Sequence, residues 1–99
     1  MSDTGVRVVA RVVALPEKLE EVKAVVTGLV EPTRKEAGCI SYELLQNQDD
    51  PTDFTFVEEW ESRELLDAHL NSPHLQEAGA KLNGIAAAAP DIRFYTLIA

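Results

Sequence analysis

The chain has 99 residues, of which 45% are hydrophobic and 26% are charged, an ordinary balance for one globular domain. Its formal net charge at pH 7 is −8. Because phosphate groups repel an acidic surface, this charge argues against nucleic-acid binding and against docking on anionic membranes. We therefore expect a single domain over residues 1–99, with neither nucleic acid nor a membrane as a partner.

The single cysteine, Cys39, permits no internal disulfide, which is typical of a protein in a reducing compartment. Asp3, Arg7 and Arg11 interrupt the valine-rich start of the chain, so it does not have the apolar core of a signal peptide. No segment approaches the roughly 18 apolar residues of a membrane helix. These features predict a cytoplasmic protein.

The first half of the chain predicts a strand, a helix and a second strand. β-Branched residues dominate Val6–Val13, which is typical of a strand. Pro16 then suits the first turn of a helix, whose buried stripe repeats at helical spacing. The stripe consists of Leu19, Val22, Val26 and Leu29. Pro32 is expected to kink this helix or to end it early, and Gly38 is a good terminator before a strand over Cys39–Asn47.

The second half predicts a hairpin, two helical segments and a last strand. The turn Asp49–Asp53 joins the second strand to a third over Phe54–Trp60. Ser62 can cap a helix that ends near Leu70, and Ser72-Pro73 can start another that ends near Leu82. The fourth strand is predicted over Asp91–Ile98.

The resulting order, β-α-β-β-α-β, is that of the ferredoxin-like α+β fold, in which both helical segments cover one face of an antiparallel sheet. Alternation gives each strand one apolar face, such as Val6, Val8, Ala10 and Val12, or Ile40, Tyr42 and Leu44. The other face mixes aliphatic with charged residues (Arg7, Val9, Arg11, Val13, Glu43, Leu45, Arg93 and Leu97). Such a face is too apolar for water and too charged for a dry core. We expect a second copy of the chain to cover it, with the charges paired across or near a two-fold interface.

Several stretches together resemble the antibiotic biosynthesis monooxygenase family over nearly the whole chain. They are Pro16-Glu17-Lys18 after the first strand, Gly38 to Glu43, Glu58 to Glu61, Ala68 to His74 and the closing strand. The resemblance implies a dimeric α+β barrel with a pocket between helices and sheet in each subunit.

The resemblance also implies a cofactor-independent monooxygenase that acts with dioxygen on a small phenol or quinol. The sequence has no flavin fingerprint, haem motif or metal-ligand spacing, so we expect no cofactor and no metal. In this hypothesis His69 is the catalytic base, because its free pKa of about 6.5 lets it take a proton near neutral pH. Trp60 would form a pocket wall and offer an N–H donor. The expected substrate-binding residues are Tyr95, Arg93, His74 and Phe56, with Arg93 or Tyr95 steadying an anionic oxygen.

Other interpretations remain open at this stage. The fold also suits an isomerase of small molecules, which arginines lining the pocket and an anionic ligand would favour. A third possibility is a non-catalytic binding or stress-response module, which an occluded pocket with His69 hydrogen-bonded into the core would favour. Haem degradation is not expected, because the haem-degrading relatives use an asparagine on the first strand and Val6–Val13 has none. His69 can be a helix cap and Trp60 a core aromatic. His74 is interpreted as a surface residue, and Glu58, Glu59 and Glu61 as a solvated strand end or an ion-pair surface.

Overall fold

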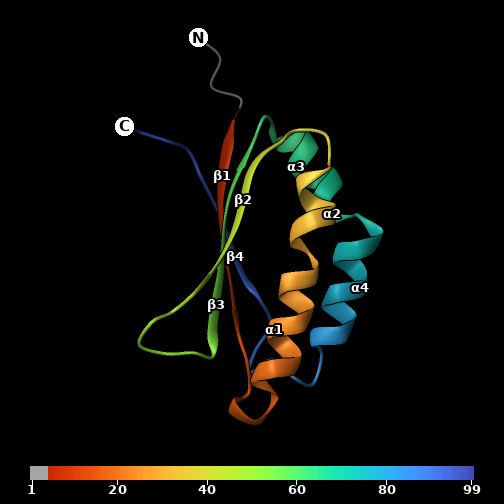
Figure 1. Ribbon diagram of the computed structural model, residues 1–99. Coiled ribbons are helices and arrows are strands. Elements are labelled where there is room, and N and C mark those ends of the chain that lie inside the picture. The colour runs from red at the N-terminus through yellow and green to blue at the C-terminus, as the bar shows by residue number, and fades with distance from the viewer. Residues whose placement is uncertain (1–4) are drawn as a thin grey trace.

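The computed structural model describes residues 5–99, which form one antiparallel sheet and one helical layer (Figure 1). In chain order the elements are β1 (Val6–Val13), the 3₁₀ turn η1 (Pro16–Lys18), α1 (Leu19–Gly28), α2 (Val30–Arg34), β2 (Cys39–Gln46), β3 (Asp53–Trp60), α3 (Arg63–Leu70), α4 (Pro73–Leu82) and β4 (Asp91–Tyr95). The strand order is β2-β3-β1-β4, and the helices lie together on one face. This arrangement confirms the predicted ferredoxin-like α+β fold.

The core lies between the helices and the apolar face of the sheet. Val8, Ala10 and Val12 of β1 are buried, whereas Val9 and Arg11 between them are exposed on the opposite face, called here the outer face. Phe54, Phe56 and Trp60 of β3 face the helices in the same way. Two-residue alternation thus assigned the helix-facing side of β1 correctly.

The first helical segment is divided in two at Leu29. Pro32 has no N–H, so it cannot donate to the carbonyl of Gly28 four residues earlier. The N–H of Leu29 instead bonds the carbonyl of Val26 at 3.2 Å, and α2 resumes with the bond from the N–H of Thr33 to the carbonyl of Leu29 at 3.1 Å. The predicted effect of Pro32 is confirmed as a local break.

The second helical segment is also divided, as the two cap signals predicted. The Oγ of Ser62 accepts a hydrogen bond from the N–H of Leu65 at the start of α3. At the end of α3, the backbone N–H and the Oγ of Ser72 both donate to the carbonyl of His69, at 3.0 and 2.7 Å. Pro73 then opens α4 in a new direction.

Two details of the strands differ from the prediction. The β2–β3 register shifts between Cys39 and Ser41, so Ile40 is the extra residue of a bulge and is 53% exposed instead of joining Tyr42 on the apolar face. Strand β4 ends at Tyr95, which pairs with Arg7, because β1 begins only one residue further on, at Val6. Residues 96–99 lie outside the strand and are exposed.

Three arginines of the outer face form ion pairs within the subunit, whereas the expectation was that the charges of this face pair across or near an interface. Three ion pairs lie on this face: Arg7 with Glu59 at 3.6 Å, Arg11 with Asp53 at 3.1 Å, and Arg93 with Asp91 at 3.0 Å. Between them Val9, Leu45, Val57 and Tyr95 remain between 37% and 50% exposed. The outer face therefore presents aliphatic and aromatic area whose neighbouring arginines are already paired with carboxylates. No helix within residues 5–99 is long and apolar enough to cross a membrane.

Candidate active site

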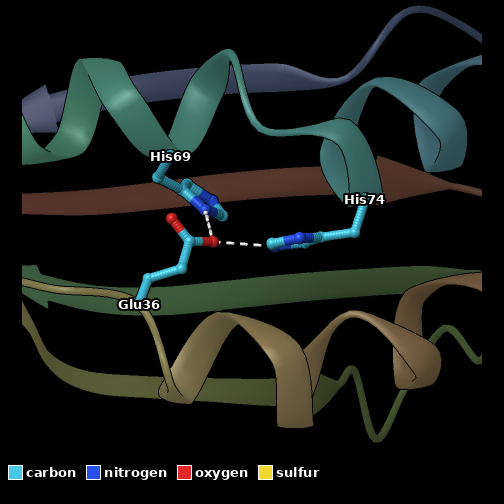
Figure 2. Close-up of side chains that lie close together, drawn as sticks. All are labelled: Glu36, His69 and His74. Carbon is cyan, nitrogen blue, oxygen red and sulfur yellow. Dashed lines mark hydrogen bonds and ion pairs between the residues drawn. The ribbon is translucent and has the colours of Figure 1, made fainter.

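Three side chains from different parts of the chain meet at one carboxylate oxygen (Figure 2). Glu36 follows α2, His69 lies in the last turn of α3, and His74 lies in the first turn of α4. Oε2 of Glu36 is 2.8 Å from Nδ1 of His69 and 2.7 Å from Nε2 of His74. These are hydrogen-bond distances, so both imidazoles can donate to the same oxygen.

The break between α3 and α4 makes this convergence geometrically feasible. In one continuous helix, residues five apart point in directions that differ by about 140°, at 3.6 residues per turn. Ser72 ends the first helix, and α4 starts again at Pro73, so His74 turns towards the same oxygen as His69. Glu36 is brought there by the break at Leu29 and by the hydrogen bond from its N–H to the carbonyl of Thr33 at 3.0 Å.

Exposure increases outward along the three residues. The side chains of His69, Glu36 and His74 are 2%, 18% and 28% exposed. Burial lowers the pKa of His69, and the hydrogen bond and charge of Glu36 only partly oppose this effect. His69 is therefore a neutral imidazole near pH 7, with its Nδ1 hydrogen directed at Glu36. His74 is partly buried and hydrogen-bonded, which corrects its interpretation as a plain surface residue.

His69 also lines a cavity of about 480 Å³ between the sheet and the helices. This volume is within the usual range for small-molecule sites. Most of the lining is aliphatic or aromatic and comes from β1, α1, α4 and β4; it includes Val8, Val12, Val26, Leu29, Leu75, Leu82 and Ile92. Within residues 5–99 no hydrogen bond reaches Nε2 of His69, and no buried side-chain nitrogen or oxygen lacks a partner. Nε2 is thus open to a molecule in the cavity.

Of the aromatic residues expected at the site, Phe56 lines the cavity and Trp60 does not. Trp60 is fully buried and stacks on His69, with ring centroids 4.7 Å apart and planes 29° apart. Its Nε1 donates to Oε1 of Glu58 at 2.8 Å, so the N–H expected to meet a substrate already has a protein partner. Trp60 therefore packs against the imidazole ring of His69 without lining the cavity.

Glu58 is a buried cavity residue that the sequence interpretation placed in solvent. It is 4% exposed and lines the cavity on the same face of β3 as Phe56 and Trp60. Burial raises its pKa to about 7, and the charge of Glu36 acts in the same direction, while the hydrogen bond from Trp60 opposes the shift. Two-residue alternation from Phe54 through Phe56 already pointed to this position. The neighbouring Tyr42 also lines the cavity, and burial raises its pKa well above the ordinary value, so it stays a neutral phenol.

Arg93 and Tyr95 do not reach this cavity, which corrects their expected role beside His69. They pair with Val9 and Arg7 of β1 and so lie on the outer face, with the sheet between them and His69. Nε of Arg93 donates to Oδ1 of Asp91 at 3.0 Å. Among the lining residues that the structure describes there is no lysine and no arginine.

Glu36, His69 and His74 also have the composition of a three-ligand metal site. One donor atom of each lies within 4.8 Å of the other two, and imidazole with carboxylate is a donor set that zinc and iron accept. A metal ion there would replace the hydrogens that now link the rings to Oε2. Sequence reasoning missed this group because Glu36 is 33 residues from His69 and carries no motif of its own.

Comparison with known proteins places the chain among relatives of the same fold. The family model described as "Antibiotic biosynthesis monooxygenase" matches residues 5–81. The chain is 31% identical to the "Uncharacterized protein sll1783" of Synechocystis over 96 residues, 97% of this chain and 65% of that protein. It is 36% identical to the "Putative monooxygenase Rv0793" of Mycobacterium tuberculosis over 69 residues, 70% of this chain and 67% of that protein.

The chain thus spans about two thirds of the length of both curated relatives. A crystal structure of a conserved protein from Methanosarcina mazei superposes with a TM-score of 0.87 at 34% identity, covering 95% of this chain and 93% of that one. The matched family model covers most of the chain and includes Glu36, Glu58, His69 and His74. The chain belongs to the antibiotic biosynthesis monooxygenase family.

Proposed function

We propose that the protein is a cofactor-independent monooxygenase of a small, uncharged phenol or hydroquinone. The observation that carries the proposal is His69, a neutral imidazole that lines an apolar cavity while Glu36 holds its Nδ1 at 2.8 Å. A carboxylate that fixes one ring nitrogen leaves the other as a base of defined orientation, as in other acid–base sites. Family membership supports the reaction class.

Removal of the phenolic proton is the step that His69 serves. Nε2 takes the O–H proton, and the imidazolium that forms is stabilised by Glu36. The phenolate is electron-rich enough to pass one electron to dioxygen, and the two radicals then combine at a ring carbon. One oxygen atom ends in the product and the other leaves as water, so the substrate itself supplies all four electrons.

The charge of the cavity favours this substrate class over an anionic one. Tyr42, Glu58 and His69 are its titratable lining residues within residues 5–99, and none of them is a fixed cation. A phosphorylated or carboxylated substrate would enter an apolar space beside Glu58 with no cation to offset its charge. Arginines lining the pocket would have favoured the isomerase alternative, and none of the described lining residues is an arginine. A non-catalytic module was expected to have an occluded pocket with His69 hydrogen-bonded into the core. His69 is buried and bonded to Glu36, but the cavity of about 480 Å³ beside it has room for a small ring system.

A homodimer formed through the outer face is part of the same proposal. Arg7, Arg11 and Arg93 are paired within the subunit, so covering the sheet would not bury them without a charge partner. Val9, Leu45, Val57 and Tyr95 would be removed from water. The single unpaired cysteine, Cys39, supports a reducing, cytoplasmic location.

Oxygen uptake with ¹⁸O₂ tests the proposal. Menadiol is a suitable probe, because transfer of one oxygen to its single quinol-ring C–H gives a hydroxylated quinone and water, whereas simple autoxidation gives menadione and hydrogen peroxide. We expect one ¹⁸O atom in the product with the wild type. His69→Gln should lower the rate about 10²- to 10⁴-fold, the usual contribution of a general base. Glu77→Gln, at an exposed position on α4, is the matched control. Absence of ¹⁸O incorporation above the buffer rate across a panel of phenols and quinols would reject the function.

A further inference from the structure

We propose that Glu58 is a second catalytic residue of the cavity, which takes the ring C–H proton when the O–O bond breaks. This inference rests on the proposed function and extends it from the first proton transfer to the last. It concerns a carboxyl group that lines the same cavity as His69 and has no role in the base geometry around Glu36.

The surroundings of Glu58 are unusual for a structural carboxylate. In register it lies between Val8 of β1 and Tyr42 of β2, and its side chain faces the helices. Its one hydrogen bond in the part of the chain that the structure describes comes from Nε1 of Trp60 to Oε1, and it forms no ion pair there. A buried carboxylate without a cation is costly to keep charged, so a purely structural role would favour an amide or an apolar residue at this position.

This environment keeps the carboxyl group available in both protonation states. Burial raises its pKa to about 7, close to neutral pH, where a group can donate and recover a proton with similar ease. The same cavity is lined by His69, the proposed base, so two groups that can transfer protons face one bound molecule, the arrangement that acid–base pairs require.

Trp60 fixes the relative position of the two groups. Its indole ring stacks on the imidazole of His69, and its Nε1 holds Oε1 of Glu58 at 2.8 Å. One fully buried side chain thus orients both proton carriers towards the same space. Oε2 of Glu58 has no hydrogen bond within residues 5–99 and is left for a bound molecule.

The proton balance of the reaction needs a second carrier. After His69 takes the O–H proton and dioxygen adds to a ring carbon, that carbon carries both a peroxide and its original hydrogen. Glu58 in its acid form protonates the distal peroxide oxygen. The O–O bond then breaks as the C–H proton passes to the carboxylate of Glu58 and the C–H electron pair forms the new C=O bond. The departing hydroxide takes the proton held by His69 and leaves as water, so both residues return to their starting states.

The test compares Glu58→Gln with Glu77→Gln. Glu77 lies at an exposed position on α4 and does not line the cavity. The Glu58→Gln side chain keeps an acceptor for Nε1 of Trp60 but cannot carry the proton. With menadiol and ¹⁸O₂, we expect Glu58→Gln to consume oxygen and release menadione and hydrogen peroxide, with the hydroxylated product reduced at least about tenfold relative to the wild type. Glu77→Gln should keep the wild-type product ratio, and Glu58→Asp should restore part of the coupling.

Each outcome decides between the two proposals. An unchanged product ratio in a folded Glu58→Gln variant would overturn the role of Glu58 and leave the proposed function standing. The role of Glu58 would also be overturned if menadiol deuterated at the reacting ring carbon showed no isotope effect on product partitioning in the wild type. If the wild type itself incorporates no ¹⁸O, the proposed function fails and this inference fails with it. If Glu58→Gln does not fold, Glu58→Asp and the deuterated probe carry the test.

Discussion

Nδ1 of His69 lies 2.8 Å from Oε2 of Glu36, a residue 33 positions earlier in the chain. The carboxylate raises the pKa of His69 against the lowering effect of burial and holds the ring in one tautomer. Base catalysis uses the neutral imidazole, so activity should rise with pH as His69 loses its proton. The pH of that rise should therefore depend on the contact with Glu36.

Replacing Glu36 by glutamine should therefore change both rate and pH profile. We expect kcat to fall about 10²- to 10⁴-fold, since an amide permits the wrong tautomer. The pKa of His69 should fall further, so the acidic limb of kcat/KM moves to lower pH. An NMR titration of His69 and a pH–rate profile measure the two effects. Glu31→Gln, at an exposed position on α2, should change neither, and an unmoved acidic limb in Glu36→Gln would contradict the proposed dyad.

The raised pKa of Glu58 predicts that the wild type and Glu58→Gln differ in stability by an amount that depends on pH. Its folded pKa is raised from 4.5 to about 7, so the folded state binds the proton more tightly than the unfolded state. This contribution to stability is complete below pH 4.5 and is lost as pH rises through about 7. Glu58→Gln should match the wild type near pH 4 and exceed it by up to about 3 kcal/mol at pH 8, at 1.36 kcal/mol per pKa unit. Urea unfolding at both pH values measures the difference, and a constant difference would exclude the shift.

Divalent metal should not be required for the proposed reaction, and zinc should inhibit it. The hydrogen on Nδ1 of His69 links the base to Glu36, and a metal held by Glu36, His69 and His74 would displace that hydrogen. Dialysis against EDTA should leave oxygen uptake unchanged, while added Zn²⁺ should lower it in a manner that EDTA reverses. Loss of activity on chelation, restored by one particular metal, would show that these three residues act as ligands instead.

If the outer face forms the dimer interface, a single charge introduced there should disrupt the dimer. Val57 and Val9 are directly paired neighbours on this face, each 37% exposed. Val57→Glu would place an unpaired carboxylate in the interface, and we expect the sedimentation coefficient to fall to that of a monomer. Lys23→Glu, at an exposed position on α1, is the control and should leave the assembly unchanged. A wild type that sediments as a monomer would remove the dimer from the proposal.

Alanine substitutions at two glycines should distinguish the stability cost of backbone strain from the cost of a steric clash. Gly38 and Gly84 have φ angles of +85° and +90°, so alanine is strained at both positions. A Cβ at Gly38 would collide with the side chain of Leu65, whereas a Cβ at Gly84 meets open space. We expect Gly84→Ala to lower the free energy of unfolding by about 1 kcal/mol and Gly38→Ala by about 3 kcal/mol or more. Equal losses in denaturant unfolding would contradict the collision.

The order of strands and helices follows from local chemistry and could be predicted from the sequence. Alternation in β1, the Ser62 cap, the proline at position 73 and the missing N–H of Pro32 each act within a few residues. His69 and Phe56 were predicted at the site and do line the cavity. By contrast, alternation alone placed Ile40 on the apolar face, and a bulge moved it out, because an extra residue reverses the pattern beyond it.

The sequence by itself thus determined the order of the elements, the helix-facing side of β1 and the family to which the chain belongs. Only the tertiary structure brought Glu36 to His69 and His74, placed Arg93 and Tyr95 on the far side of the sheet, and showed that Glu58 is buried. The physical reason is that caps and periodicity act over a few residues, whereas a site joins residues tens of positions apart. Such contacts are set by how two broken helical segments pack on one face of a twisted sheet.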